Sequence, residues 1–397
     1  MPPLSIMLKP ASGMCNMRCD YCFYHDETAR RAVASYGFMT EETLKNVIRR
    51  TMPRAEGYIS YACQGGEPTL CGIDFFRNAV KYVRQYNRNQ VHVSLALQTN
   101  GYGITEEWAE FFAEEQFLIG ISVDGLERIH STYRHGNDGG DSWQHAMNAI
   151  RLFHQYGVEF NILTVVHRET AENIREIYRF YRANGWNFMQ FITCLDPLGE
   201  PRGGKPWSLL PKTYGQFLID LFDLWYADFL HEDQPFIRQF DNYVGILLGF
   251  EPESCEQRGI CGIQNVVEAD GSVYPCDFYV LDDYRLGNLN EDLLPAIYAA
   301  REKMGYVARS QNHPDKCRSC RWLELCRGGC YRSRMTAADE MLAEAGLAGA
   351  SATSASETAE STEGLNYFCE GYQMFFEACY DKLVKVAETA RQRMHNP

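Results

Sequence analysis

The stretch "SGMCNMRCDYCFYH" (residues 12–25) contains three cysteines, at positions 15, 19 and 22. A structural zinc site or a fully ligated [4Fe–4S] cluster needs four protein ligands. Three thiolates therefore indicate a metal site that keeps one position open for another molecule, as catalytic metal sites do. Taken alone, the same spacing also allows a zinc knuckle completed by His25 or by a distant residue.

The sequence around this stretch alternates between strand-like and helix-like segments. One helix-like segment starts at Thr40, which precedes an acidic first turn, and another ends near Gly185. Apolar, β-favouring runs occupy residues 5–10, 58–64, 91–98, 117–123, 158–166 and 187–195. This alternation predicts successive βαβ units, a parallel sheet and, with six units, a partial (β/α)6 barrel.

Chemistry in such barrels lies at the carboxyl ends of the strands. The three cysteines follow the first run, and "GGEP" (65–68), "TNG" (99–101) and "SVDG" (122–125) follow the next three. A Gly-Gly-Glu-Pro tetrad alone is more often an ordinary turn. Its position after a strand, like that of the cysteines, favours a shared site at this end of the barrel.

The region after residue 235 has a different pattern. The segment 264–280 predicts a hairpin that turns at Asp270-Gly271, and a helix is expected around 291–304. The aromatic-rich segment 365–386 predicts a terminal helix. We therefore expect a small α+β domain after the barrel, with domain bounds of 1–235 and 236–397.

Residues 335–364 form a low-complexity segment within the second domain. They are rich in Ala, Ser, Thr and Glu and contain no aromatic residue. A segment of this composition cannot build a core of its own. We expect an inserted loop that is helical only at its Ala-rich start.

Composition excludes several classes of protein. The chain has 397 residues, of which 45% are hydrophobic, and a net charge of −14. It has no block of Lys and Arg, no apolar run long enough to span a membrane and no secretory signal pattern at its N-terminus. We expect a cytoplasmic monomer that binds neither nucleic acid nor membrane.

Fifteen cysteines in such a chain favour metal ligation or catalysis over a disulfide framework. Nine of them lie after residue 254, with a dense group spaced Cys317-x2-Cys320-x5-Cys326-x3-Cys330. A zinc ribbon built from residues 317–330 is one interpretation of that group. A second iron–sulfur region is the other.

The spacing Cys15-x3-Cys19-x2-Cys22 after a first strand resembles the signature of the radical S-adenosylmethionine (SAM) enzymes. The resemblance implies that these thiolates hold three irons of a [4Fe–4S] cluster, while the fourth iron binds the amino and carboxylate groups of SAM. It also implies a set of SAM contacts from the strand ends: Tyr21 to the adenine, Gly65 and Gly66 to the ammonium, Ser122 and Arg134 to polar groups, and Leu195 to the adenine. From the residues alone, the first interpretation would be that Arg134 is a solvated surface charge and Leu195 a core residue.

The cysteines after residue 254 resemble the SPASM extension of radical SAM maturases, which carries two auxiliary [4Fe–4S] clusters. By that pattern one set holds the nearer cluster: Cys255, Cys261, Cys276 and Cys330. The other set holds the outer cluster: Cys317, Cys320, Cys326 and Cys369. Clusters with all four positions filled cannot bind substrate, so electron transfer is the role left to them. Four cysteines remain as ordinary thiols: Cys63, Cys71, Cys194 and Cys379.

Motifs along nearly the whole chain resemble the anaerobic sulfatase-maturating enzymes, among them "CQGGEPTL" (63–70), "LQTNG" (97–101) and "DGSVYPCDFYVLDDYRLGN" (270–288). The resemblance implies oxidation of a cysteine or serine in a Cys/Ser-x-Pro-x-Arg motif of an unfolded or nascent sulfatase to Cα-formylglycine. A 5′-deoxyadenosyl radical from SAM would take a hydrogen atom from the target Cβ. Asp277, directly after Cys276, is the expected base, with Tyr24 and Gln64 orienting the target or Asp277.

Two other functions fit parts of this pattern. A SPASM peptide maturase would form thioether or carbon–carbon crosslinks in a ribosomal peptide, but usually has a recognition domain before the barrel. A multi-cluster electron carrier or a zinc-stabilised scaffold would leave the glycine tetrad and the six-strand order unexplained. We therefore expect the sulfatase-maturating oxidase, with a ferredoxin or flavodoxin as its electron donor.

Overall fold

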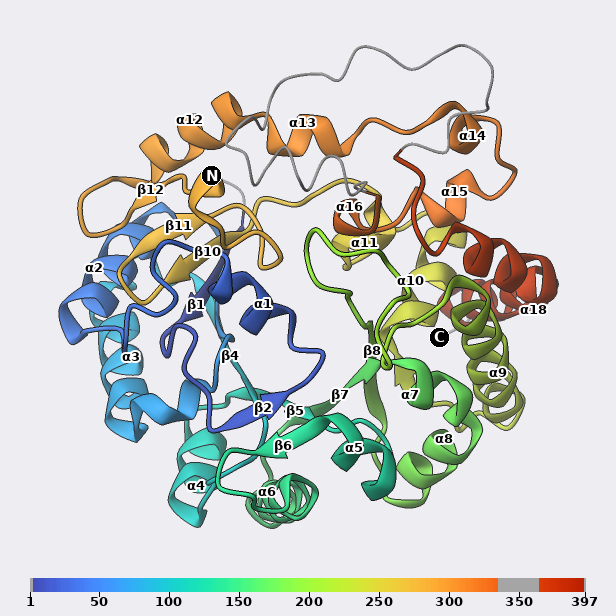
Figure 1. Cartoon of the computed structure of the whole chain (residues 1–397), viewed down its shortest axis with the longest axis horizontal. Helices are drawn as coiled ribbons and strands as arrows, with labels where there is room; N and C mark the ends of the chain where they lie inside the picture. Colours follow the sequence, from blue (N-terminus) through green and yellow to red (C-terminus); the bar gives the residue numbers. More distant parts are fainter. Residues whose placement is uncertain (1–2, 335–363, 396–397) are drawn as a thin grey trace. The chain divides into compact units, whose positions relative to one another are not determined.

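The computed structural model describes residues 3–334 and 364–395 (Figure 1). The chain divides into two compact units. The first unit consists of Met1–Val123, Glu127–Leu163 and Ile263–Tyr306, and the second of Asp124–Leu126, Thr164–Gly262 and Val307–Pro397. The loop predicted for 335–364 lies outside the described residues except for Gly364. The domain bounds of 1–235 and 236–397 stay a prediction.

The strands match the six predicted runs. Five strands of the first unit pair in parallel with their neighbours, in the order β1, β3, β4, β5 and β7. Their bounds are Leu4–Lys9, Tyr58–Cys63, His92–Thr99, Leu118–Ser122 and Phe160–Val166. β7 continues into the second unit, which also contains the sixth run as β8 (Phe188–Thr193), paired in parallel with β9 (Phe236–Ile237). The partial barrel of βα units is confirmed.

Helices of the first unit form where the sequence supplies caps and apolar stripes. Helix α2 begins after Thr40, whose hydroxyl accepts a hydrogen bond from the Thr43 N–H at 3.1 Å, so the predicted N-cap is confirmed. The helices of this unit are α1 (Phe23–Ala29), α2 (Glu41–Thr51), α3 (Ile73–Tyr86), α4 (Glu106–Glu114), α5 (Glu127–Tyr133), α6 (Ser142–Tyr156) and α12 (Leu294–Met304). A separate two-stranded sheet joins β2 (Met17–Cys19) to β6 (Arg134–Gly136).

A strand from late in the chain completes the first unit's sheet. β10 (Asn265–Glu268) pairs in parallel with β1, with Lys9 opposite Glu268, and in antiparallel with β11 (Ser272–Tyr274). The predicted hairpin at Asp270-Gly271 is therefore confirmed, and β12 (Gly287–Asn288) pairs with β11 at its outer side. The sequence did not predict that β10 covers the free edge of β1, although an uncovered edge strand exposes unpaired backbone groups.

The second unit is mainly helical. Gly185, with φ of +71°, lies just past the end of α8, in the left-handed conformation expected after a helix. The helices of this unit are α7 (Arg168–Glu172), α8 (Ile174–Ala183), α9 (Pro211–Leu230), α10 (Arg238–Leu247), α11 (Cys255–Arg258), α14 (Asp315–Arg318), α15 (Leu323–Cys326), α16 (Tyr331–Arg334) and α18 (Cys369–His395), while α13 (Tyr306–Ser310) starts in the first unit.

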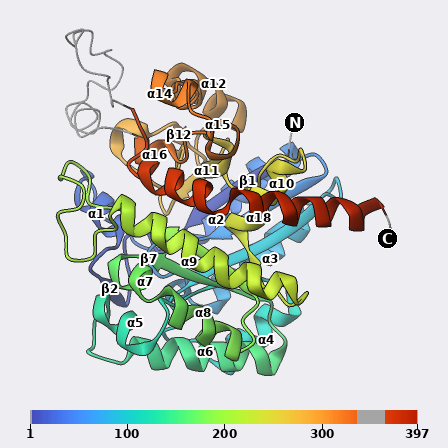
Figure 2. The same ribbon diagram turned by 90° about the vertical axis from the view of Figure 1, so that its right-hand side faces the viewer.

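Helices α9 and α18 lie side by side in the second unit (Figure 2). A Cβ atom on Gly215 would lie 2.8 Å from the Cα of Gly371, so glycine on both helices allows this close approach. Phe375 of α18 packs its ring against Phe222 of α9, with 5.7 Å between ring centroids. The predicted terminal helix is thus confirmed, and aromatic packing holds it to α9.

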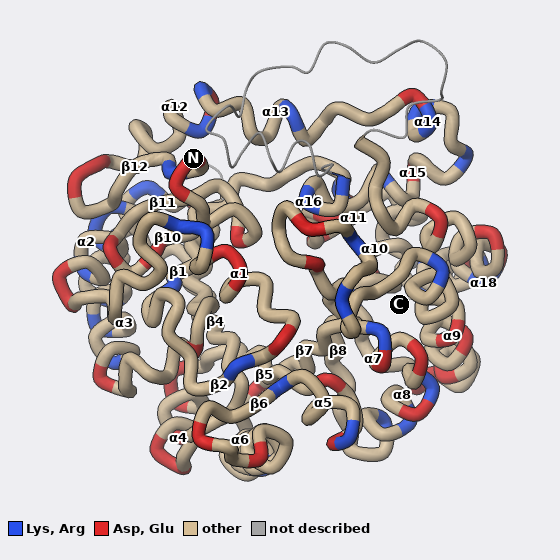
Figure 3. Tube along the Cα trace, in the orientation of Figure 1, with Lys and Arg blue, Asp and Glu red and all other residues tan. Residues whose placement is uncertain are grey.

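Charged residues of both signs are interspersed along the described chain, as Figure 3 shows. Among the described residues, no helix combines the length and apolar character needed to cross a membrane.

We expect Phe375→Ala to destabilise the second unit. The side chain is fully buried, and truncating a buried Phe costs about 3–5 kcal/mol because it leaves a cavity. Denaturant unfolding followed by far-UV circular dichroism measures the change. Glu388→Ala, at an exposed position on the same helix, is the matched control and should change stability by less than about 0.5 kcal/mol. Equal effects of both substitutions would contradict the packing described here.

Candidate active site

The three N-terminal cysteines lie in the first unit, in residues 12–22 after β1, a segment called the cysteine loop below, in which Cys19 is the last residue of the short strand β2. Two side chains donate hydrogen bonds to their sulfurs: Asn100 Nδ2 to Cys15 Sγ at 3.7 Å, and an Arg134 guanidinium nitrogen to Cys19 Sγ at 3.9 Å. Burial raises the pKa of the Cys15 thiol to about 11. The three cysteines are half-buried, and donors beside two of them suit metal-bound thiolates, because such donors stabilise charge on the sulfur.

The loop is held in place by the glycine-rich tetrad after β3. Gly66 has a φ of +57°, and a Cβ there would lie 2.2 Å from the carbonyl oxygen of Met14. The Glu67 N–H donates to that same carbonyl at 2.9 Å. Only glycine allows the tetrad to approach the cysteine loop this closely. This packing role stands beside the predicted contact of Gly66 with SAM, which stays a prediction.

Glu67 is a structural carboxylate that sequence reasoning passed over. It is buried, and it accepts hydrogen bonds from the N–H and hydroxyl of Thr69, the hydroxyl of Thr99 and the N–H of Asn100. Burial raises its pKa above the usual range of a glutamate. Because Asn100 also donates to Cys15, Glu67 links the ends of β3 and β4 to the cysteine loop.

The other residues predicted to bind SAM are placed as follows. Arg134 lies over the ring of Tyr21, with 5.6 Å from the guanidinium carbon to the ring centroid, and both side chains are buried. Arg134 is therefore not a surface charge. Ser122 is the last residue of β5 in the same unit. Leu195 follows β8 in the second unit. Their contacts with SAM stay predictions.

Asp277 lies in the first unit, and both of its carboxylate oxygens have a partner. Oδ1 accepts from the ammonium of Lys9, and Oδ2 accepts from the side-chain amide of Gln64 at 2.8 Å. The predicted contact between Gln64 and Asp277 is therefore present. Tyr24 instead donates to Glu268 Oε2 at 2.6 Å, so it does not orient Asp277 through a direct hydrogen bond.

Lys9 and Glu268 are site residues that sequence reasoning missed. Lys9 is fully buried, and its ammonium lies 3.8 Å from the centroid of the Tyr24 ring. Glu268 is also fully buried and is paired with Arg31. A lysine that ends an apolar strand ("SIMLKP") directly before a cysteine motif was the available signal, since a buried lysine needs a partner of opposite charge.

Gly65 provides the space that Lys9 occupies. A Cβ on Gly65 would lie within 2.9 to 3.1 Å of Lys9 Nζ, Cγ and Cδ, and Gly65 itself has a φ of +109°. The first glycine of the tetrad therefore packs against the lysine that pairs with Asp277. Its predicted contact with the SAM ammonium stays a prediction.

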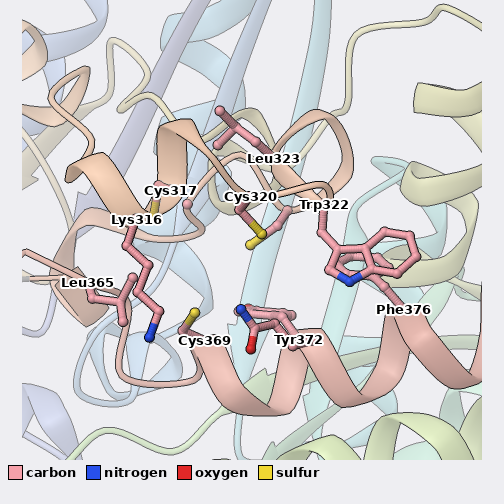
Figure 4. Close-up of a pocket in the computed structure, with 12 residues that line it drawn as sticks. Lys316, Cys317, Cys320, Trp322, Leu323, Leu365, Cys369, Tyr372 and Phe376 are labelled. Atoms are coloured by element: carbon pink, nitrogen blue, oxygen red, sulfur yellow. The ribbon is translucent and has the colours of Figure 1, made fainter. Parts of the chain in front are cut away.

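The outer set of cysteines comes together in the second unit. All four line one hollow, beside Lys316 and Trp322: Cys317, Cys320, Cys326 and Cys369. Figure 4 labels Cys317, Cys320 and Cys369 in this hollow. Burial raises the pKa of Cys326 to about 12, with smaller contributions from the other three thiols. Cys369 starts α18 and joins this set from a position 43 residues after Cys326. Four sulfurs in one hollow fit a four-ligand iron–sulfur cluster.

The four cysteines predicted to hold the nearer auxiliary cluster do not all belong to the same unit. Burial raises the pKa of Cys330 to about 12, and Cys255 and Cys261 are close enough to add to this effect. These three lie in the second unit, whereas Cys276 follows β11 in the first. Within residues 3–334 and 364–395, no three Cys, His, Asp or Glu side chains meet at single-ion distances. The predicted ligand sets of the three clusters therefore stay predictions.

Two family models match the chain. Residues 10–181 match the radical SAM superfamily, and residues 260–321 match the SPASM iron–sulfur cluster-binding domain. A cysteine-type anaerobic sulfatase-maturating enzyme of Clostridium novyi is 42% identical over 395 residues, which is all of both chains. The chain belongs to the anaerobic sulfatase-maturating enzymes.

Other members of the family are similar to different degrees. A serine-type anaerobic sulfatase-maturating enzyme of Bacteroides thetaiotaomicron is 29% identical, over 94% of this chain and 89% of its own. The solved structure described as native anSMEcpe with bound AdoMet and Kp18Cys peptide has a TM-score of 0.87 and 40% identity, and it covers 98% of this chain and 100% of its own. The fold predicted from sequence, a radical SAM barrel with a SPASM domain, is therefore confirmed.

We expect Gly66→Ala to disturb the N-terminal cluster selectively. The added Cβ cannot fit beside the Met14 carbonyl, so the cysteine loop must move. The variant should lose cleavage of SAM, measured as 5′-deoxyadenosine, while iron analysis shows that the auxiliary clusters are kept. Gly57→Ala is the matched control, because Gly57 has a similar φ of +70° with no atom near its Cβ position. If both variants cleave SAM equally well, the tetrad does not position the loop.

Proposed function

We propose that the protein oxidises a cysteine in the Cys-x-Pro-x-Arg motif of a sulfatase polypeptide to Cα-formylglycine, with Asp277 as the base. We infer the type of reaction from the chain's membership of the sulfatase-maturating enzymes. Greater identity with the cysteine-type relative (42%) than with the serine-type relative (29%) favours cysteine as the target. The observation that supports the base is the buried carboxylate of Asp277, which is held by Lys9 and Gln64 and follows Cys276 directly.

The cofactors of the family are SAM and three [4Fe–4S] clusters. When bound, the N-terminal cluster and SAM supply a radical that removes a hydrogen atom from the target Cβ, and the auxiliary clusters take up one electron. The residues that would hold the first cluster are Cys15, Cys19 and Cys22. The nearer auxiliary cluster would be held by Cys255, Cys261, Cys276 and Cys330, and the outer one by Cys317, Cys320, Cys326 and Cys369.

The protein's own contribution is to receive a proton at a fixed point. After loss of the Cβ hydrogen, the target is a carbon-centred radical that still carries its S–H group. Loss of that proton and one electron leaves a C=S double bond, which water converts to the aldehyde with release of hydrogen sulfide. Asp277 Oδ1 or Oδ2 takes the proton, and its neighbour in sequence is a cluster ligand, so proton and electron leave in the same region.

Lys9 and Gln64 fix the orientation of Asp277. Lys9 is anchored by its complete burial and by the Tyr24 ring, while Gln64 extends from the end of β3. Two donors on opposite oxygens leave the carboxylate few ways to rotate. A fixed base lowers the entropic cost of the proton transfer.

The remaining parts of the proposal concern partners and setting. The electron donor is a small acidic carrier such as a ferredoxin or flavodoxin, and the enzyme works as a cytoplasmic monomer. The substrate is an unfolded or nascent chain, because the target motif must enter the site as an extended segment. Crosslinking of a ribosomal peptide is the alternative, and it predicts a product that retains its sulfur.

The central test uses anaerobically reconstituted enzyme with dithionite, SAM and two peptides that contain Cys-x-Pro-x-Arg or Ser-x-Pro-x-Arg. We expect an aldehyde product from the cysteine peptide by mass spectrometry, formed faster than from the serine peptide. Asp277→Asn should abolish the aldehyde while 5′-deoxyadenosine still forms, because the amide cannot accept the proton. SAM cleavage with no change in either peptide would reject the substrate, and an active Asp277→Asn variant would reject the base.

We expect Lys9→Met to separate SAM cleavage from product formation. The variant leaves the Asp277 carboxylate buried with a single hydrogen-bond donor, and the rate of aldehyde formation should fall by roughly tenfold to a hundredfold. The ratio of 5′-deoxyadenosine to aldehyde, measured by chromatography, should rise by a similar factor. Lys45→Met, at an exposed position on α2, is the control and should leave this ratio unchanged. An unchanged ratio in Lys9→Met would contradict the positioning role.

A further inference from the structure

Arg301 is a buried cation that has no acidic partner among the described residues. It lies on α12 in the first unit with 4% of its surface exposed. One guanidinium nitrogen donates to Asn265 Oδ1 at 3.0 Å and another to the Pro275 carbonyl at 3.5 Å. Its Nε has no hydrogen-bond partner. Both acceptors are neutral, so the described residues leave the positive charge without a counter-charge.

The surroundings of Arg301 include a thiol that carries a lasting negative charge once it binds a metal. The groups that interact with it electrostatically are Tyr298, Tyr306 and Cys276. Burial raises the pKa of Tyr298, so that phenol is neutral at neutral pH. Burial also lowers the pKa of Arg301 to about 10, which still leaves the guanidinium charged at neutral pH. A metal-bound Cys276 thiolate is then the natural counter-charge.

An unpaired buried charge is expensive, and natural proteins rarely keep one. The acceptors of Arg301 also fix it in one place. Asn265 is on β10, where its amide nitrogen donates to the Ser5 carbonyl of β1 at 3.1 Å, and Pro275 directly precedes Cys276. The guanidinium is therefore tied both to the sheet and to the peptide that carries the cysteine.

We propose that Arg301 raises the reduction potential of the auxiliary cluster bound by Cys276 and so favours its uptake of the electron from the substrate. This inference rests on the proposed function, because it takes Cys276 as a ligand of that cluster. One-electron reduction adds one negative charge to the cluster. A fixed positive charge nearby stabilises the reduced form more than the oxidised form. Arg301 acts through the cluster and does not touch the substrate.

The test is a redox titration of the fully reconstituted enzyme, followed by electron paramagnetic resonance (EPR). We expect Arg301→Met to lower the potential of one cluster so that its reduction equilibrium constant falls about tenfold, which is 59 mV for a one-electron couple. That component should be insensitive to SAM, which perturbs only the cluster with an open iron. It should also be the component that is lost in Cys276→Ala.

Two further variants keep the test informative if Arg301→Met folds poorly. Asn265→Asp keeps Arg301 and its hydrogen bond but supplies the missing carboxylate, so it should lower the same potential. Arg301→Lys keeps the charge and should restore most of the wild-type potential. Arg50→Met is the matched control, because Arg50 is in the same unit and binds backbone carbonyls of residues 290–292. It should shift no potential.

Three unchanged potentials in both Arg301→Met and Asn265→Asp, with wild-type iron content, would overturn the inference. A shift confined to the SAM-sensitive cluster, or to the component that survives in Cys276→Ala, would overturn it as well. The proposed function fails separately, through the absence of an aldehyde product from wild-type enzyme in the peptide assay. A wild-type enzyme that makes the aldehyde while Arg301 shifts nothing rejects this inference alone.

Discussion

The parallel pairing of β1 with β10 is the contact on which the rest of the candidate site depends. It sets Lys9 opposite Glu268 and leads the chain through a tight hairpin to Cys276 and Asp277. The end of β1 thus supplies a cation, and the segment after β11 supplies the carboxylate that neutralises it. Separating the two strands would leave buried charges without partners, at a cost of about 3–5 kcal/mol for a broken buried pair. The same pairing also brings the two ends of the first unit together in one sheet.

Buried charge is used in two ways in this unit. Arg31, Glu268, Lys9 and Asp277 form two complete ion pairs, joined by the Tyr24 side chain, which donates to Glu268 and lies against the Lys9 ammonium. These pairs hold their four side chains in fixed positions, because each charged group is buried and has a single counter-charge within its pair. Arg301 is the exception, since its two acceptors are neutral. In the first unit, the buried Lys9 and Arg31 each pair with a carboxylate, whereas the acceptors of Arg301 are neutral. This contrast supports the proposal that an anionic cluster lies beside Arg301.

Backbone geometry at two glycines positions parts of the candidate site, alongside the side-chain contacts. Gly65 and Gly66 both have positive φ, yet they make room for different neighbours, Lys9 in one case and the Met14 carbonyl in the other. The tetrad therefore packs against both the lysine that pairs with Asp277 and the cysteine loop. In the second unit, glycines on α9 and α18 allow a similar close approach.

The sequence by itself determined the six strand runs, the cap at Thr40, the hairpin at Asp270-Gly271 and the cysteine spacings, because each is a local pattern with its own physical cause. It also singled out Asp277, through its position beside Cys276. Only the tertiary structure decided which distant residues meet: Lys9 with Asp277, Tyr24 with Glu268, and Cys369 with the cysteines of residues 317–326. The reason is that local periodicity in a sequence shows which face of a helix or strand is apolar. Whether a charged side chain can be buried depends instead on a partner of opposite charge or a hydrogen-bonding group elsewhere in the sequence. Here that partner comes from more than two hundred residues away, 268 positions for Lys9 and 244 for Tyr24.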